Sequence, residues 1–173
     1  MIRKTKETNI EIRYNDKNQI DTGDLILNHM LNTLFFYMEK PVYIKAEYDL
    51  KHHLWEDIGI TIGMFLNDHD QNISRFGTST VPMDDSLIIL SLDLSRSYLN
   101  FSVNFTNEEG FELYILREFI WGLARTMNMT LHIIKLNGEN PHHITENIFK
   151  CLGFALKDAL QKDDRMNSTK GSL

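Results

Sequence analysis

The chain has 173 residues, of which 42% are hydrophobic and 10% aromatic, so it can form one domain with a substantial core and is too apolar to be disordered. Its net charge of −6 and pI of about 5.6 argue against nucleic acid or an anionic membrane as the main partner. A single cysteine, a polar N-terminal stretch and the lack of an apolar run of roughly 18 residues lead us to expect a soluble cytoplasmic protein.

The first half of the chain predicts a strand, a helix, another strand and a second helix. A strand is expected around residues 10–14. Residues 24–38 place their apolar side chains on one face at helical spacing. Residues 41–48 alternate and are rich in β-branched and aromatic side chains, which indicates a strand. Residues 52–68 indicate the second helix.

The second half repeats this order. Its predicted elements are strands at 86–94 and 98–105, a helix at 111–127, a strand at 130–137 and a helix at 142–160. The segment Gly138–Pro141 is a predicted turn, and proline suits the first position of a helix. The polar residues after 160 are predicted to form a tail.

Two copies of a His-His-x-x-Glu motif support an internal duplication. The motifs begin at His52 and His142, 90 residues apart. The first helix of each half carries a matched polar residue, since His29 stands 23 residues before His52 and Glu118 stands 24 before His142. We therefore expect an α+β fold of two duplicated half-domains, each a small sheet with two helices packed on one side, forming a layered structure.

The expected organisation is a single domain with its halves at about residues 1–80 and 81–162. Residues 163–173 are then a C-terminal substrate-binding tail.

The motif geometry predicts two metal sites. On a helix, residues three or four apart share a face, whereas adjacent histidines point about 100° apart. Each motif is therefore expected to serve two ions. Imidazole and carboxylate donors without cysteine suit Mn²⁺, Fe²⁺ or Zn²⁺. The candidate ligands are His29, His52, His53, Glu56, Glu118, His142, His143 and Glu146.

Each candidate also has a structural interpretation. A single such motif is more often an ordinary helix surface, and the second aligned copy is what favours a metal. For His29 the alternative is a satisfied core histidine, although its equivalence to Glu118 favours a ligand. His69 and His132 match nothing across the repeat and are interpreted as structural, and Cys151 as packing.

Several short motifs, taken in order, resemble one enzyme family. They are TKET from Thr5, NHML from Asn28, HHLWED from His52, RFG from Arg75, VPMD from Val81, DLSR from Asp93, GEN from Gly138 with HHITE and IFK, and STKG from Ser168. Together they resemble the imidazoleglycerol-phosphate dehydratases of histidine biosynthesis, over nearly the whole chain.

This resemblance implies conversion of imidazoleglycerol phosphate to imidazoleacetol phosphate. It implies two Mn²⁺ ions per subunit, with sites at the subunit interfaces of a homo-oligomer of 24 chains, and a small-molecule phosphate substrate. The implied catalytic carboxylates are Glu7 and Glu146. The implied phosphate-binding residues are Arg75, Arg96, Lys150, Ser168 and Lys170.

Some positions depart from the family pattern. They are Asn28, Tyr37, Lys51 and Asn167, together with a shortened loop before Arg96. Lys51 has the most consequence, because a cation beside a dimetal site weakens metal binding unless it points away. Lys51 and Tyr37 would support one alternative, a degenerate metal-binding relative with a structural or regulatory role. A second alternative is a dimetal phosphoester hydrolase, which the cluster of phosphate-binding residues does not exclude.

Overall fold

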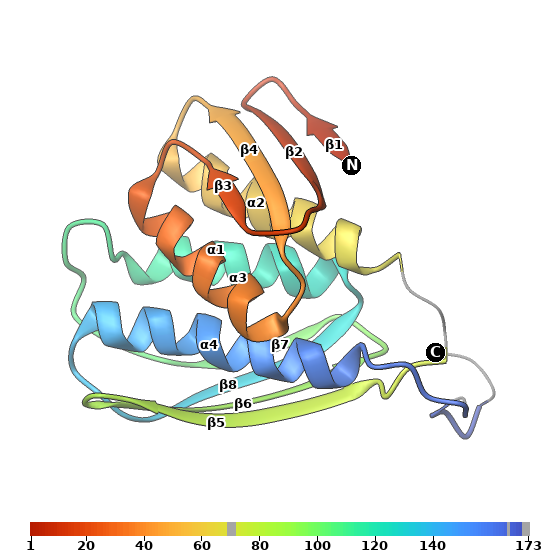
Figure 1. Ribbon diagram of the computed structural model, residues 1–173. Coiled ribbons are helices and arrows are strands. Elements are labelled where there is room, and N and C mark those ends of the chain that lie inside the picture. The colour runs from red at the N-terminus through yellow and green to blue at the C-terminus, as the bar shows by residue number, and fades with distance from the viewer. Residues whose placement is uncertain (69–71, 166, 171–173) are drawn as a thin grey trace.

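The computed structural model describes residues 1–68, 72–165 and 167–170, and within these ranges four helices lie between two four-stranded sheets (Figure 1). The first sheet has the order β1-β2-β4-β3, and the second has the order β5-β6-β8-β7. The strands of the first sheet are β1 (Ile2–Lys4), β2 (Thr8–Tyr14), β3 (Gln19–Asp21) and β4 (Val42–Tyr48). Those of the second are β5 (Phe76–Met83), β6 (Ser86–Leu94), β7 (Tyr98–Ser102) and β8 (Met129–Asn137).

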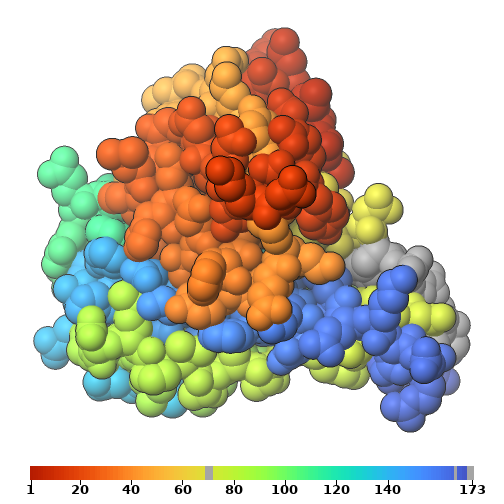
Figure 2. All heavy atoms as spheres, viewed as in Figure 1, coloured from red at the N-terminus to blue at the C-terminus, as the bar shows by residue number. Residues whose placement is uncertain are grey.

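The two sheets have the same strand directions as well as the same order. In each, three strands are antiparallel and the fourth pairs in parallel, β3 with β4 and β7 with β8. Figure 2 shows the first-half residues stacked on the second-half residues. The predicted α+β fold of duplicated half-domains is therefore confirmed. The division at about residue 80 stays a prediction, and the second sheet begins at Phe76.

The helices pair across the two halves. They are α1 (Leu25–Met38), α2 (Lys51–Leu66), α3 (Leu113–Thr126) and α4 (Pro141–Ala159). Helix α1 packs on α4 and α2 packs on α3. The buried rings of Trp55, Phe119 and Phe149 meet between three helices, with Phe119 and Phe149 centroids 4.9 Å apart. This arrangement places α1 beside the motif on α4.

Glycines allow these helix pairs to approach closely. A Cβ on Gly63 of α2 would lie 2.7 Å from the Leu123 carbonyl oxygen of α3. A Cβ on Gly153 of α4 would lie 2.6 Å from the Leu34 carbonyl oxygen of α1. The two glycines are 90 residues apart, which is the spacing of the two HHxxE motifs.

Polar caps fix where two helices begin. The Asp24 side chain accepts from the backbone N–H groups of Ile26 and Leu27, and its second oxygen accepts from Trp55 Nε1 at 3.1 Å. The Asn140 side chain caps α4, and Pro141 opens that helix as predicted.

The sequence did not predict strands β1, β3 and β5. Strand β7 ends at Ser102 rather than at the predicted residue 105. β5 lacks apolar alternation because its core-facing positions include Gly77 and Ser79, which lie close to α4. In the described part of the chain, no helix is long and apolar enough to cross a membrane.

Candidate metal centre

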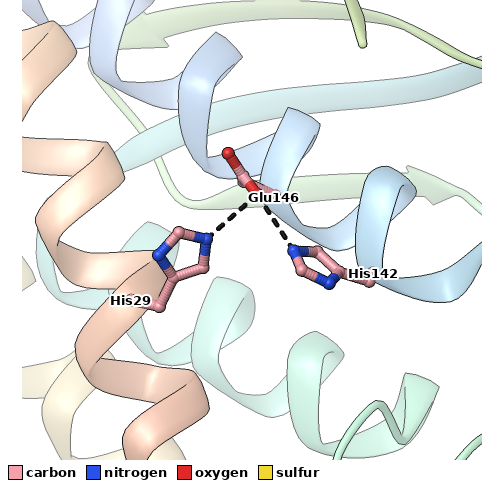
Figure 3. A group of neighbouring side chains, drawn as sticks. All are labelled: His29, His142 and Glu146. Atoms are coloured by element: carbon pink, nitrogen blue, oxygen red, sulfur yellow. Dashed lines mark hydrogen bonds and ion pairs between the residues drawn. The ribbon is translucent and has the colours of Figure 1, made fainter. Parts of the chain in front are cut away.

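One cluster of imidazole and carboxylate groups lies between α1 and α4 (Figure 3). The Nε2 atom of His29 lies 3.0 Å from Glu146 Oε2, and the Nε2 atom of His142 lies 3.1 Å from the same oxygen. Among the described residues, this is the group of three whose donor atoms all fall within 4.8 Å of one another. Its members come from both halves of the chain.

The environment of Glu146 keeps its carboxylate ionised. Lys150 Nζ lies 3.0 Å from Glu146 Oε1, one helical turn along α4. Burial raises the pKa of Glu146, but hydrogen bonds with His29, Lys150 and His142 outweigh it, so the pKa is lowered overall. Both carboxylate oxygens are therefore engaged, and an anion is held beside two imidazoles.

This donor set fits a transition metal. Two imidazole nitrogens and a carboxylate oxygen are ligands that Mn²⁺, Fe²⁺ and Zn²⁺ accept. The His29 side chain is 52% exposed, so the alternative of a buried core histidine is wrong. The candidate centre is open on the side of that residue.

The first motif lies apart from this cluster. His52 is exposed at the start of α2, with its ring centroid 4.2 Å from that of His53. Glu56 Oε1 accepts from Arg125 at 2.8 Å. Glu118 is exposed on α3 and lines a cleft of about 470 Å³. Within the described residues of one chain, these groups do not converge as His29, His142 and Glu146 do.

An aspartate holds the second histidine of each motif. His53 Nδ1 lies 2.8 Å from Asp49 Oδ1, and His143 Nδ1 lies 2.7 Å from Asp85 Oδ1. The hydrogen bond with Asp49 raises the pKa of His53. A carboxylate on one ring nitrogen commonly orients a histidine whose other nitrogen binds a metal.

Asp49 and Asp85 were missed by sequence reasoning. The spacing of Asp49 and His53, four residues apart, was a usable signal. Asp85 comes from the β5–β6 turn, 58 residues before His143, so no local pattern reveals it. Asp85 also accepts from the backbone N–H groups of Glu139 and Asn140, and these hydrogen bonds hold its pKa far below the usual range.

Four of the five predicted phosphate-binding residues fall in two places. Lys150 lies at the His29 cluster. Arg75 is paired with both carboxylate oxygens of Asp93, at 2.6 and 2.9 Å, and donates to the Asn167 carbonyl at 2.8 Å. Arg75 thereby contacts the segment that carries Ser168 and Lys170. Arg96 is exposed after β6. Residue 166 and the tail from 171 to 173, like His69, lie outside the described residues.

A cleft of about 670 Å³ adjoins the cluster. Its lining includes His29, Glu146, Lys150, Lys17 and Tyr37. This volume suits a small molecule, and the lining carries charges of both signs, with Lys17 and Lys150 beside Glu39 and Glu146. The Tyr37 ring packs on Phe154 with centroids 4.8 Å apart.

A family model described as imidazoleglycerol-phosphate dehydratase matches residues 22–156. The chain belongs to the imidazoleglycerol-phosphate dehydratase family. It is accordingly a dehydratase of histidine biosynthesis, a hydro-lyase. The resemblance inferred from the short motifs is confirmed.

Individual relatives agree with the family match. The imidazoleglycerol-phosphate dehydratase of Pyrococcus furiosus is 51% identical over 176 residues, with both chains covered in full, and that of Streptococcus sanguinis is 41% identical over 187 residues, covering 99% of this chain and 96% of the other. A crystal structure of the P. furiosus enzyme in complex with (S)-C348 matches with a TM-score of 0.96 at 50% identity, covering both chains in full. A crystal structure of the Staphylococcus aureus enzyme matches with a TM-score of 0.82 at 32% identity, covering 94% of this chain and 98% of the other.

Proposed function

We propose that the chain converts imidazoleglycerol phosphate to imidazoleacetol phosphate at the centre formed by His29, His142 and Glu146. The observation that carries this proposal is the convergence of two imidazole nitrogens and a carboxylate beside a cleft that also contains Lys150. Family membership supports the same reaction.

We assign His29, His142 and Glu146 to one metal ion. The donors proposed for a second ion, and for completing both sites, are His52, His53, Glu56, Glu118 and His143. Bound metal would favour the deprotonated form of the substrate imidazole. We propose two Mn²⁺ ions per subunit, since the donor types suit Mn²⁺ but also Fe²⁺ and Zn²⁺.

The two candidate carboxylates differ in their availability for proton transfer. Glu146 is engaged by three donors and suits a ligand. The Glu7 side chain is 54% exposed and lies 3.9 Å from His53 Nδ1. We therefore propose Glu7 as the group that takes the proton from carbon. This proton balances the hydroxyl, which leaves as water, and the resulting enol becomes the ketone when its O–H proton is replaced by one on carbon.

The substrate phosphate is assigned to a set of cations and one hydroxyl. This set is Arg75, Arg96, Lys150, Ser168 and Lys170, and residues 163–173 are proposed to form a substrate-binding tail. Guanidinium and ammonium groups bind phosphate through charge-assisted hydrogen bonds. The Arg75 contact with Asn167 supports grouping Arg75 with the tail.

We propose that the remaining donors are brought together in an oligomer. His52 and Glu118 are exposed in the single chain, which supports donors shared across an interface. Family resemblance suggests 24 subunits. Because shared ligands couple metal binding to association, the mass measured by light scattering should rise on Mn²⁺ addition to metal-stripped protein.

Turnover of imidazoleglycerol phosphate, followed by NMR of substrate and product, tests the reaction. Mn²⁺-loaded protein should form the ketone, and protein from which a chelator has removed the metal should not. Glu146→Gln should lower kcat at least about 100-fold, since even outer-shell changes at metal sites cost about 10–100-fold. Glu47→Gln, an exposed site on β4, is the matched control.

Metal analysis of the same samples tests the stoichiometry. About two ions per chain are expected after loading, and far fewer would contradict the two-site proposal. No turnover by loaded, assembled protein would instead favour a degenerate relative. Release of inorganic phosphate from phosphoesters would favour a hydrolase.

A further inference from the structure

The residue that follows each HHxxE motif is a buried polar side chain. Asp57 follows Glu56 and is 7% exposed, and Asn147 follows Glu146 and is fully buried. A buried polar group is costly unless it is hydrogen-bonded, so the partners of these two residues indicate why a polar side chain occupies the position.

In the first half, Asp57 holds the beginning of β2. Its carboxylate accepts a hydrogen bond from the Thr8 hydroxyl. The two oxygens also pair with the two terminal nitrogens of the Arg3 guanidinium, at 3.0 Å and 2.9 Å. Thr8 is the first residue of β2 and directly follows Glu7. Thr5 Oγ1 also accepts from the backbone N–H groups of Glu7 and Thr8, which closes the turn between β1 and β2.

In the second half, Asn147 holds the beginning of β6 in the same way. Its Nδ2 atom lies 3.1 Å from Ser86 Oγ and 2.8 Å from the Val81 carbonyl oxygen. Ser86 is the first residue of β6 and directly follows Asp85. Val81 pairs with Ile88 two residues beyond Ser86, just as Arg3 pairs with Ile10 two residues beyond Thr8.

Each anchored turn carries an acidic residue to the second histidine of its own motif. Glu7 Oε2 lies 3.9 Å from His53 Nδ1. Asp85 Oδ1 lies 2.7 Å from His143 Nδ1. The two halves therefore share the same series of contacts. The polar residue after the motif bonds a hydroxyl residue at the start of a strand, and the acidic residue just before that strand lies beside a histidine of the motif.

We propose that Asp57 and Asn147 are positioning residues, which act through Thr8 and Ser86 to place Glu7 near His53 and to hold Asp85 against His143. The hydrogen bonds of the two copies run in opposite directions. Asp57 accepts from donors, whereas the Asn147 amide donates to oxygens. In the first half the inference rests on the proposed role of Glu7, and in the second half it concerns the placement of His143.

A double-mutant cycle separates positioning from general stabilisation. Thr8→Val should lower kcat by about tenfold with little change in KM, since misplacing a reacting group by a fraction of an ångström slows the reaction. Thr8→Ser, which keeps the hydroxyl, should restore kcat. In a Glu7→Gln background, Thr8→Val should add little, because the two changes remove the same contribution. Thr78→Val, which removes a hydroxyl pair with Ser91 on β5 and β6, is the matched control.

The outcomes distinguish this inference from the proposed function. A normal kcat in Glu7→Gln would overturn the catalytic role of Glu7. A low kcat in Glu7→Gln together with a normal kcat in Thr8→Val, or effects that multiply in the double variant, would overturn the positioning role and leave the proposed function intact.

Crystal structures of the assembled variants test the inference without turnover. Asn147→Asp sets a carboxylate against carbonyl oxygens, and Ser86→Ala is the milder change if Asn147→Asp does not fold. The expected result is a displaced β5–β6 turn in which Asp85 is too far from His143 for a hydrogen bond. A turn that stays in place in both Ser86→Ala and Thr8→Val would overturn the proposal.

Discussion

Lys51 Nζ lies 3.0 Å from Glu112 Oε2 and 3.3 Å from the Gly110 carbonyl oxygen. The cation beside the first motif is thus neutralised by the segment that leads into α3. Both side chains are about one-third exposed or less, so solvent screens this pair only partly. Lys51, the departure from the family pattern with the greatest expected effect on metal binding, has a partner that reduces this effect.

Removing the partner of Lys51 should therefore weaken metal binding more than removing Lys51. Glu112→Gln leaves the ammonium charge uncompensated near His52 and His53, and the Kd for Mn²⁺ should rise several-fold. Lys51→Met should leave the Kd unchanged or lower it. Calorimetric titration of metal-stripped protein measures both.

The double variant is the control for this prediction. Lys51→Met in the Glu112→Gln background should restore the wild-type Kd, because no uncompensated charge remains. Equal Kd values for wild type and Glu112→Gln would show that Lys51 has no electrostatic effect on the metal. Lys51→Met should lower the free energy of unfolding by no more than about 1 kcal/mol, since solvent still screens this half-buried pair in part.

Asp49 and Asp85 should affect metal affinity through the histidines that they orient. Asp49→Asn and Asp85→Asn are each expected to weaken Mn²⁺ binding by about 10–100-fold, as for other outer-shell carboxylates. Asp85→Asn should also lower the free energy of unfolding, because Asp85 accepts from two backbone N–H groups before α4. Wild-type metal affinity in both variants would contradict an orienting role. Asp158→Asn, exposed on α4, is the control.

The sequence predicts the long elements of this fold well because their apolar periodicity is strong. Helices α1 and α4, for example, lie within one residue of the predicted bounds. Short edge strands such as β1 and β3 carry three residues each, too few for a pattern. β5 was missed because Gly77 and Ser79 occupy core positions that need small side chains beneath α4.

Prediction of the site from sequence also fails where residues far apart in the chain meet. The motif repeat pointed to His142 and Glu146, and the match between halves added His29, which the structure brings to the same point. The repeat could not indicate which histidines converge within one chain, because that depends on α1 packing on α4. Contacts such as Asp85 with His143 depend on the turns between strands, for which the local pattern gave no signal.

Asp93 should make stability depend on pH on the acid side. Burial raises the pKa of Asp93, but hydrogen bonds from Arg75 and Ser95 outweigh it and lower the pKa below the unfolded value of about 3.9. A lowered folded-state pKa adds stability that is fully present above the unfolded pKa and is lost as the pH falls through the folded one.

Asp93→Asn should therefore destabilise the protein at pH 7 by about 1–3 kcal/mol, the usual cost of leaving a charged partner unsatisfied. The difference from wild type should shrink below about pH 4, where the Asp93 carboxyl of the unfolded chain takes up a proton before that of the folded protein does. Urea unfolding at pH 7, 5 and 3.5 measures the difference in the free energy of unfolding between the variant and wild type. A difference that stays constant over this range would contradict the role of ionised Asp93. Asp21→Asn, an exposed aspartate at the end of β3, is the matched control.

Gly153 controls the distance between the two helices that carry the candidate metal centre. An added Cβ there would meet the Leu34 carbonyl oxygen at 2.6 Å, and backbone cannot move aside cheaply. Gly153→Ala should cost about 1–3 kcal/mol as overpacking, although alanine is the better helix former. Asp158→Ala, exposed on the same helix, tests propensity without the clash and should be neutral or stabilising.

The same substitution should act on the metal. Moving α1 away from α4 separates His29 from Glu146, which now lie 3.0 Å apart, and so weakens the shared donor set. Gly153→Ala is therefore expected to raise the Kd for Mn²⁺ at temperatures well below its Tm, where the chain is folded. Unfolding monitored by circular dichroism and metal titration on one sample separate the two effects. A lowered Tm with an unchanged Kd would mean that the α1–α4 spacing does not set the geometry of the centre.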